Sequence, residues 1–247
     1  MNEILKIYRV KDWVHYAGYI LFGSLISGNI NYTNFLIAFF MLAYAFSLND
    51  YYDKKKKDKL FVLPLLFSFI FLPFLNYIQL FFYFSFIVIF TLYSLPSTYL
   101  EGRPLFSILT NSIGFLFIFL LPFTNIEKIL KFLDFSLLLF LLNVTAQIIH
   151  EIEHYKDDRK VRKITTAISL GIKTSTLLLR LVLITTFLFS LSLFSRFNFI
   201  SISTLLFSCY FFFLSYGKIN EKFRKKFKIY GIVCGVLYVL DLLRLTS

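Results

Sequence analysis

The segment NDYYDKKKKD, residues 49–58, directly follows a long run of apolar residues. It begins with an amide and two carboxylates and continues with four consecutive lysines. On a helix, residues three or four positions apart share a face, and Asn49, Asp50 and Asp53 have this spacing. The sequence therefore predicts that three oxygen-bearing side chains converge where an apolar helix ends.

The composition of the chain is that of a membrane protein. Of the 247 residues, 58% are hydrophobic and 16% are charged, and the mean hydropathy is +0.73. Apolar stretches of about 20 residues, the length that crosses a bilayer as a helix, recur from end to end. We expect an all-α, polytopic membrane protein in which residues 1–247 form one transmembrane domain. The nine expected spans are residues 13–30, 33–50, 60–75, 77–96, 104–124, 132–154, 174–194, 198–216 and 227–245.

Neither cysteine nor the N-terminus suggests another class of protein. Cys209 and Cys234 both fall within expected spans, so they indicate neither a disulfide framework nor a metal cluster. No cleavable signal peptide is expected, because the first apolar run is a full span without a small-residue cleavage site.

The net charge is +12, and the distribution of the basic residues along the chain indicates its cause. Lys and Arg residues are concentrated in the N-terminal segment and in the loops after the second, fourth, sixth and eighth spans. Basic loops of membrane proteins face the cytoplasm, so we expect the N-terminus and these loops on the cytoplasmic side of the cell (plasma) membrane. The charge thus reports topology in a lipid bilayer, and no nucleic-acid partner is expected.

A second group of polar residues ends the sixth expected span, in HEIEHYKDD, residues 150–158. Steps of four, four, three and four residues place five side chains in one stripe along the helix. Glu153 and Asp157 lie off this stripe but near its end. The stripe consists of Asn143, Gln147, Glu151, His154 and Asp158.

Polar stripes within a bilayer usually line a cavity or a pathway. Clustered carboxylate and amide oxygens suit Mg²⁺, which normally bridges one or two carboxylates to the phosphates of a substrate. The two acidic helix ends therefore indicate a phosphate-bearing substrate bound at the cytoplasmic interface. The alternative is that these carboxylates are solvated or paired with the neighbouring lysines.

Four segments together resemble the UbiA-type intramembrane prenyltransferases. They are NDxxD at the end of the second span, YxxD followed by Thr166 through Leu170–Gly171 after the sixth, LYSLPSTYLEGRPLF at residues 92–106, and RVKDW at residues 9–13. Nine spans with cytoplasmic motifs are also the architecture of this family. The resemblance covers essentially the whole chain.

This resemblance implies a helical bundle with a central cavity open to the cytoplasmic side. It implies the Mg²⁺-dependent transfer of a polyprenyl group from a polyprenyl diphosphate to a lipophilic acceptor, either aromatic or lipid. The residues expected to be catalytic are Asp50, Asp53, Glu151 and Asp158, and these four with Asn49 are the expected Mg²⁺ ligands. The residues expected to bind substrate are Lys54, Lys57, Arg103, Gln147, His154, Tyr155 and Asp157.

The chain departs from the family pattern at four positions. Lys57 and His154 stand where the family usually has an Asp, and Tyr99 and Glu101 stand where relatives are often basic. These departures leave open a catalytically altered or silent family member. A transporter or ion pathway is the alternative from another class, since intramembrane acids also mark ion routes.

Overall fold

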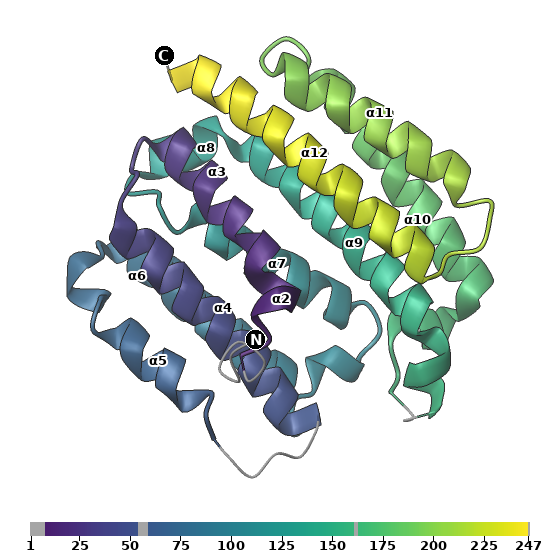
Figure 1. Ribbon diagram of the computed structural model, residues 1–247, viewed down its shortest axis with the longest axis horizontal. Helices are drawn as coiled ribbons and strands as arrows, with labels where there is room; N and C mark the ends of the chain where they lie inside the picture. The colour runs from purple at the N-terminus through teal and green to yellow at the C-terminus, as the bar shows by residue number, and fades with distance from the viewer. Residues whose placement is uncertain (1–7, 54–58, 161–162, 247) are drawn as a thin grey trace. The chain divides into compact units, whose positions relative to one another are not determined.

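The computed structural model describes residues 8–53, 59–160 and 163–246. Within these residues every regular element is a helix (Figure 1). The α-helices are α2 (Val10–Trp13), α3 (Ala17–Ser27), α4 (Tyr32–Asp53), α5 (Val62–Phe69), α6 (Tyr77–Ser94), α7 (Phe106–Leu120), α8 (Ile126–Lys131), α9 (Leu133–Lys160), α10 (Thr166–Ser192), α11 (Asn198–Leu214) and α12 (Glu221–Thr246). Three short 3₁₀ turns accompany them, namely η1 (Val14–Tyr16), η2 (Leu72–Phe74) and η3 (Leu100–Gly102).

The helices form two compact units. The first comprises Met1–Leu100 with Ile113–Phe132, and the second comprises Glu101–Ser112 with Leu133–Ser247. The expectation of a single domain over residues 1–247 stays a prediction.

In the first unit, α4 packs against α3, α5 and α6. Aromatic rings fill the space between the helices, as where Tyr16 stacks on Phe115 with ring centroids 3.6 Å apart. Some buried polar groups are paired within the unit: the Gln79 amide donates to the Asn34 side-chain oxygen and to the Leu121 carbonyl. Apolar packing with internally paired polar groups is what a helix bundle in a membrane requires.

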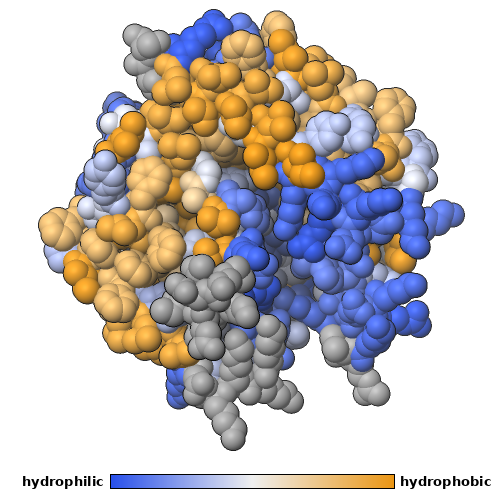
Figure 2. Space-filling view, viewed as in Figure 1, coloured by the Kyte–Doolittle hydropathy of each residue, from blue (hydrophilic) through white to orange (hydrophobic). Residues whose placement is uncertain are grey.

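In the second unit, α9, α10, α11 and α12 each pack against the next, and α12 also packs against α9. Buried residues of these helices and of α7 form one hydrophobic core. Its members are Ile108, Ile148, Ile149, Ile152, Ala167, Leu179, Leu183, Phe207, Phe211 and Phe223. Hydrophilic side chains gather around the N-terminal part of α12, whereas hydrophobic side chains cover much of the rest of that helix (Figure 2).

Four of the described helices, α4, α6, α9 and α10, are long and apolar enough to cross a membrane, and α7 and α11 are shorter apolar helices. The 28 residues of α9 extend about 42 Å at 1.5 Å per residue. This length exceeds the bilayer core of about 30 Å, so α9 is longer than a helix needs to be to cross it. The chain is an integral membrane protein, and the count of nine spans stays a prediction.

Two expected spans are not continuous helices. Residues 13–30 are divided among the last residue of α2, η1 and α3. The break between α2 and η1 falls at Trp13, whose φ of −124° leaves the helical region. Residues 60–75 contain only the eight residues of α5, followed by a turn and η2. Hydropathy alone does not detect such interruptions.

The expected span at residues 174–194 largely coincides with the later part of α10, which begins earlier, at Thr166. Within α10, Gly171 has φ 76° and ψ 160° and interrupts the helical backbone. Positive φ of this kind favours glycine because it carries no Cβ. The Thr166–Leu170 turn is thereby set apart from the long apolar part of α10.

The close approach of α3 to Phe119 generates a stability prediction. A Cβ on Gly23 would collide with the Phe119 carbonyl oxygen, whereas a Cβ on Gly18 of the same helix would meet nothing within 4 Å. We expect Gly23→Ala to destabilise the protein by about 1–3 kcal/mol through overpacking. Thermal unfolding in detergent measures this, with Gly18→Ala as the matched control that leaves stability unchanged or slightly raised. Equal stability of the two variants would contradict this packing.

Candidate active site

The last two turns of α4 carry the first acidic group. Asn49 is half-buried, Asp50 is 2% exposed, and Asp53 is exposed as the final residue of the helix. All three lie at the C-terminal end of α4, where the helix dipole is negative and disfavours a carboxylate. A nearby cation is therefore needed to hold Asp50 ionised in a buried position.

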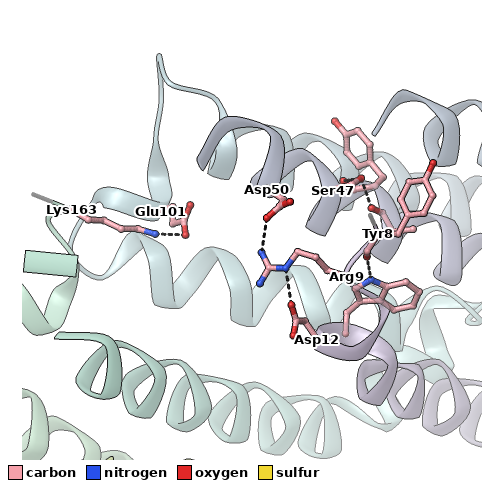
Figure 3. Close-up of polar contacts among 10 residues, drawn as sticks. Tyr8, Arg9, Asp12, Ser47, Asp50, Glu101 and Lys163 are labelled. Carbon is pink, nitrogen blue, oxygen red and sulfur yellow. Dashed lines mark hydrogen bonds and ion pairs between the residues drawn. The ribbon is translucent and has the colours of Figure 1, made fainter. Parts of the chain in front are cut away.

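Arg9 is one such cation. Its guanidinium Nη1 lies 3.8 Å from Asp50 Oδ1, and its Nε donates to Asp12 Oδ2 at 2.7 Å, so that it points toward both carboxylates (Figure 3). Arg9 adopts a left-handed backbone, with φ 51°, just before α2, a conformation that costs a non-glycine residue about 1–2 kcal/mol. The bond from the buried Trp13 indole to the Tyr8 carbonyl anchors this segment. The sequence pattern RVKDW did not predict that Arg9 pairs with Asp50.

The second acidic group lies near the C-terminal end of α9. Asn143 is buried and its amide donates to the Leu139 carbonyl of its own helix. Gln147 and Asp158 are half-buried, whereas Asp157 is exposed and paired with Lys160 at 2.9 Å. Tyr155 packs against the hydrophobic core of the second unit, which is a structural contact.

Glu151 is the most enclosed acid of the stripe, at 5% exposure. One carboxylate oxygen accepts a hydrogen bond from the Ser107 hydroxyl at the start of α7, and the other accepts from the Ala167 amide at 3.0 Å. Ala167 lies in the first turn of α10, where the helix dipole is positive and stabilises a carboxylate. Glu151 thus joins α7, α9 and α10, and its expected role as a metal ligand stays a prediction.

His154 lies among charged neighbours. Arg224, near the start of α12, donates to Glu153 Oε2 at 2.7 Å and to His154 Nε2 at 3.1 Å. His150 packs against His154 with ring centroids 4.5 Å apart. The imidazole therefore pairs with a residue of α12 that the sequence did not connect to it.

The segment after α6 is fixed to the start of α10. Glu101 and Lys163 form an ion pair in which both side chains are largely buried (Figure 3). The Leu105 amide donates to the Thr166 hydroxyl at 2.8 Å, which supports the strained Leu105 backbone at φ 65°. Strain of this kind concentrates at functional sites. Lys163 thereby supplies a cation beside Glu101, one of the departures from the family pattern.

Three further cations, Arg103, Lys54 and Lys57, were expected to bind substrate. Arg103 is exposed in the segment before α7. Lys54 and Lys57 lie outside the described residues.

Two further charged residues, one buried and one half-buried, were not singled out from the sequence. Asp241 of α12 is 2% exposed and accepts from the Ile200 amide in the first turn of α11 at 2.8 Å. Arg180 of α10 donates to Ser215 at the end of α11 and lies 3.8 Å from the centre of the Tyr216 ring. Each charge stabilises the helix end of opposite polarity, so we assign both a structural role.

The two groups differ in the donor atoms they offer to a metal. The end of α4 offers amide and carboxylate oxygens, the ligands that Mg²⁺ prefers. The end of α9 offers Asp158 oxygens as well as the imidazoles of His150 and His154. The residues present therefore fit Mg²⁺ at α4, with Asp158 as an oxygen donor of the same kind.

Comparison with known proteins gives consistent results. Residues 59–232 match the model of the UbiA prenyltransferase family. This range begins after NDYYD, so the first acidic group lies outside it. Comparison with curated proteins gives no match.

Solved structures with the same fold cover nearly the whole chain. A structure described as digeranylgeranylglyceryl phosphate synthase in membranes aligns with a TM-score of 0.75 and 18% identity, covering 98% of each chain. A UbiA homologue from Archaeoglobus fulgidus bound to GPP and Mg²⁺ aligns with a TM-score of 0.71 and 15% identity, covering 98% of this chain and 99% of the other. These likenesses extend the shared fold over α4 and its acidic end.

The contacts of Glu151 generate a prediction about its role. Glu151→Leu leaves the Ser107 hydroxyl and the Ala167 amide without their acceptor, at a cost of about 1–3 kcal/mol for each buried group. Glu151→Gln retains one acceptor oxygen, so we expect it to be destabilised less. Thermal unfolding in detergent compares the two, with Gln147→Leu on the same stripe as control. Wild-type stability in Glu151→Leu would contradict the assigned contacts.

Proposed function

The chain belongs to the UbiA prenyltransferase family, and on this basis we propose that it transfers a polyprenyl group from a polyprenyl diphosphate to a lipophilic acceptor within the membrane. The acceptor presents either an aromatic ring or a lipid hydroxyl group. We propose that the reaction depends on Mg²⁺ and takes place at the cytoplasmic side.

The observation that carries this proposal is the placement of carboxylates at the C-terminal ends of two apolar helices. Asp50 and Asp53 end α4, and Asp158 lies in the last turn of α9. Negative charge is disfavoured at a helix C-terminus and expensive near a bilayer. A divalent ion that bridges these carboxylates to a diphosphate would supply the positive charge that they need.

We propose that Asn49, Asp50 and Asp53 from α4, together with Asp158 from α9, hold Mg²⁺ and through it one diphosphate. When bound, Mg²⁺ supplies positive charge that stabilises the negative charge on the departing diphosphate. The Archaeoglobus fulgidus homologue bound to GPP and Mg²⁺ supports this ligand pair. Glu151 contributes by fixing α9 against the start of α10.

In the proposed reaction, the bond between prenyl carbon C1 and the diphosphate oxygen breaks, and the diphosphate keeps the electron pair. A new bond forms between C1 and the acceptor, which then loses a proton. Arg9, Arg103 and Lys163 would add positive charge near the diphosphate. Apolar helix faces would enclose the hydrocarbon chain, at about 0.8 kcal/mol per buried CH₂, and would keep water from the allylic cation.

The proposed acidic ligands generate a prediction of activity. Asp50→Asn, Asp53→Asn and Asp158→Asn should each reduce prenyl transfer by at least about 100-fold, because even residues that only support a metal ligand contribute 10- to 100-fold. The measurement is transfer from radiolabelled C₁₀ to C₂₀ donors to a panel of acceptors, with purified protein and varied Mg²⁺.

The matched control is Glu127→Gln, an acid-to-amide change at an exposed position in the first turn of α8. It should retain wild-type transfer. Full activity in Asp50→Asn and Asp53→Asn would refute the role of α4 as a metal-binding helix. Activity that needs no divalent ion would refute the dependence on Mg²⁺.

The orientation is a separate part of the proposal. Topology reporters fused after Asp53 and after Lys160 should both read cytoplasmic, because the basic segments of the chain adjoin these helix ends. Reporters fused after Asn125 and after Phe197 should read external. An external reading after either acidic helix would separate the two groups and contradict a shared diphosphate.

A further inference from the structure

One turn of α9 carries three side chains with metal-binding atoms on one face. His150, Glu153 and His154 are spaced three and four residues apart, and one ligand atom from each lies within 4.8 Å of the other two. His150 is exposed, and Glu153 and His154 are half-buried. Because all three side chains come from a single helix, their backbone positions are fixed relative to one another.

The donor set differs from that at the end of α4. Two imidazole nitrogens and one carboxylate oxygen are the ligands of Zn²⁺ and similar transition-metal ions, whereas Mg²⁺ prefers oxygen ligands alone. Ligands at about 2.0–2.2 Å from a zinc ion lie closer together than 4.8 Å, so small side-chain rotations would complete the site.

The segment His150-Glu151-Ile152-Glu153-His154 also has the spacing of two histidines four residues apart with a Glu after the first, which in zinc proteases binds a catalytic ion. In those enzymes that Glu acts as the general base. Here both oxygens of Glu151 accept hydrogen bonds from Ser107 and Ala167. The spacing therefore fits metal binding without the hydrolytic chemistry.

The Arg224 guanidinium lies where a metal ion bound to this cluster would lie. Its guanidinium contacts both Glu153, at 2.7 Å, and His154 Nε2, at 3.1 Å. Since a guanidinium only donates hydrogen bonds, His154 Nε2 accepts and its lone pair points toward Arg224. A metal ion needs that same lone pair and the same carboxylate oxygen, so ion and guanidinium compete.

We propose that His150, Glu153 and His154 form a binding site for a transition-metal ion such as Zn²⁺, which the ion enters by displacing Arg224. Displacement releases the contact between α9 and the start of α12 within the second unit. Metal binding at this site does not require prenyl transfer, although His154 is among the residues expected to bind the prenyl substrate.

The test is a Co²⁺ titration of the purified full-length protein in detergent, followed by visible absorption, with Zn²⁺ and Mg²⁺ as competitors. In the presence of excess Mg²⁺, which occupies the proposed carboxylate site, the wild type should bind one Co²⁺ with a spectrum of nitrogen and oxygen ligands, and Zn²⁺ should displace it. His150→Ala and His154→Ala should each weaken binding at least about tenfold.

Arg224→Met distinguishes this site from casual binding to surface histidines. It should bind Co²⁺ severalfold more tightly than the wild type, whereas Lys225→Met, which removes an exposed neighbouring cation, should not change the affinity by a comparable factor. Thermal unfolding checks that each variant is folded. Absence of a Co²⁺ spectrum in the wild type, unchanged binding in His150→Ala, or no gain in Arg224→Met would overturn the proposal. The spectrum reports binding whether or not prenyl transfer is detected.

Discussion

Negative side chains at the C-terminal ends of apolar helices require positive charge beside them. The structure meets this requirement locally. Arg9 stands beside the buried Asp50 at the end of α4, and Arg224 stands beside Glu153 near the end of α9. Where the charge is instead at a helix N-terminus, as with Asp241 at α11, the helix itself supplies the positive partner. The same rule explains why the acids at the ends of α4 and α9 are suited to bind cations.

The second unit shows how such a site is held in place. Glu151 links α7, α9 and the start of α10 through two hydrogen bonds, and the ion pair of Glu101 with Lys163 fixes the preceding loop. The strained Leu105 is supported by Thr166. These contacts allow a polar end to remain ordered where it leaves the apolar core.

Much of the fold could be predicted from the sequence. Apolar length and the positions of basic residues indicated a helical membrane protein, and the motifs indicated its family, which the comparisons confirm. The three-to-four residue spacing correctly placed Asn49, Asp50 and Asp53 in the last turns of one helix. The interruption at Trp13 was not predicted, because apolar length does not indicate where the backbone of a single residue leaves the helical region.

The partners of the polar residues could not be predicted. Helical periodicity tells which side chains share a face, but it does not tell which other segment packs against that face. Glu151 was expected to face a metal ion, and in the structure it accepts bonds from Ser107 and Ala167. Likewise, nothing in the sequence connects His154 with Arg224, which is 70 residues away along the chain.

The proposed reaction depends on one arrangement, in which carboxylates from two distant helices bind the same diphosphate through Mg²⁺. The most direct measurement is an experimental structure of the full chain in lipid with Mg²⁺ and a prenyl thiolodiphosphate that resists ionisation. We expect metal ions about 2.0–2.1 Å from oxygens of Asp50 or Asp53 and of Asp158, with all of these ions in contact with one bound diphosphate. A diphosphate that contacts only one of these helix ends, or that binds elsewhere, would contradict it.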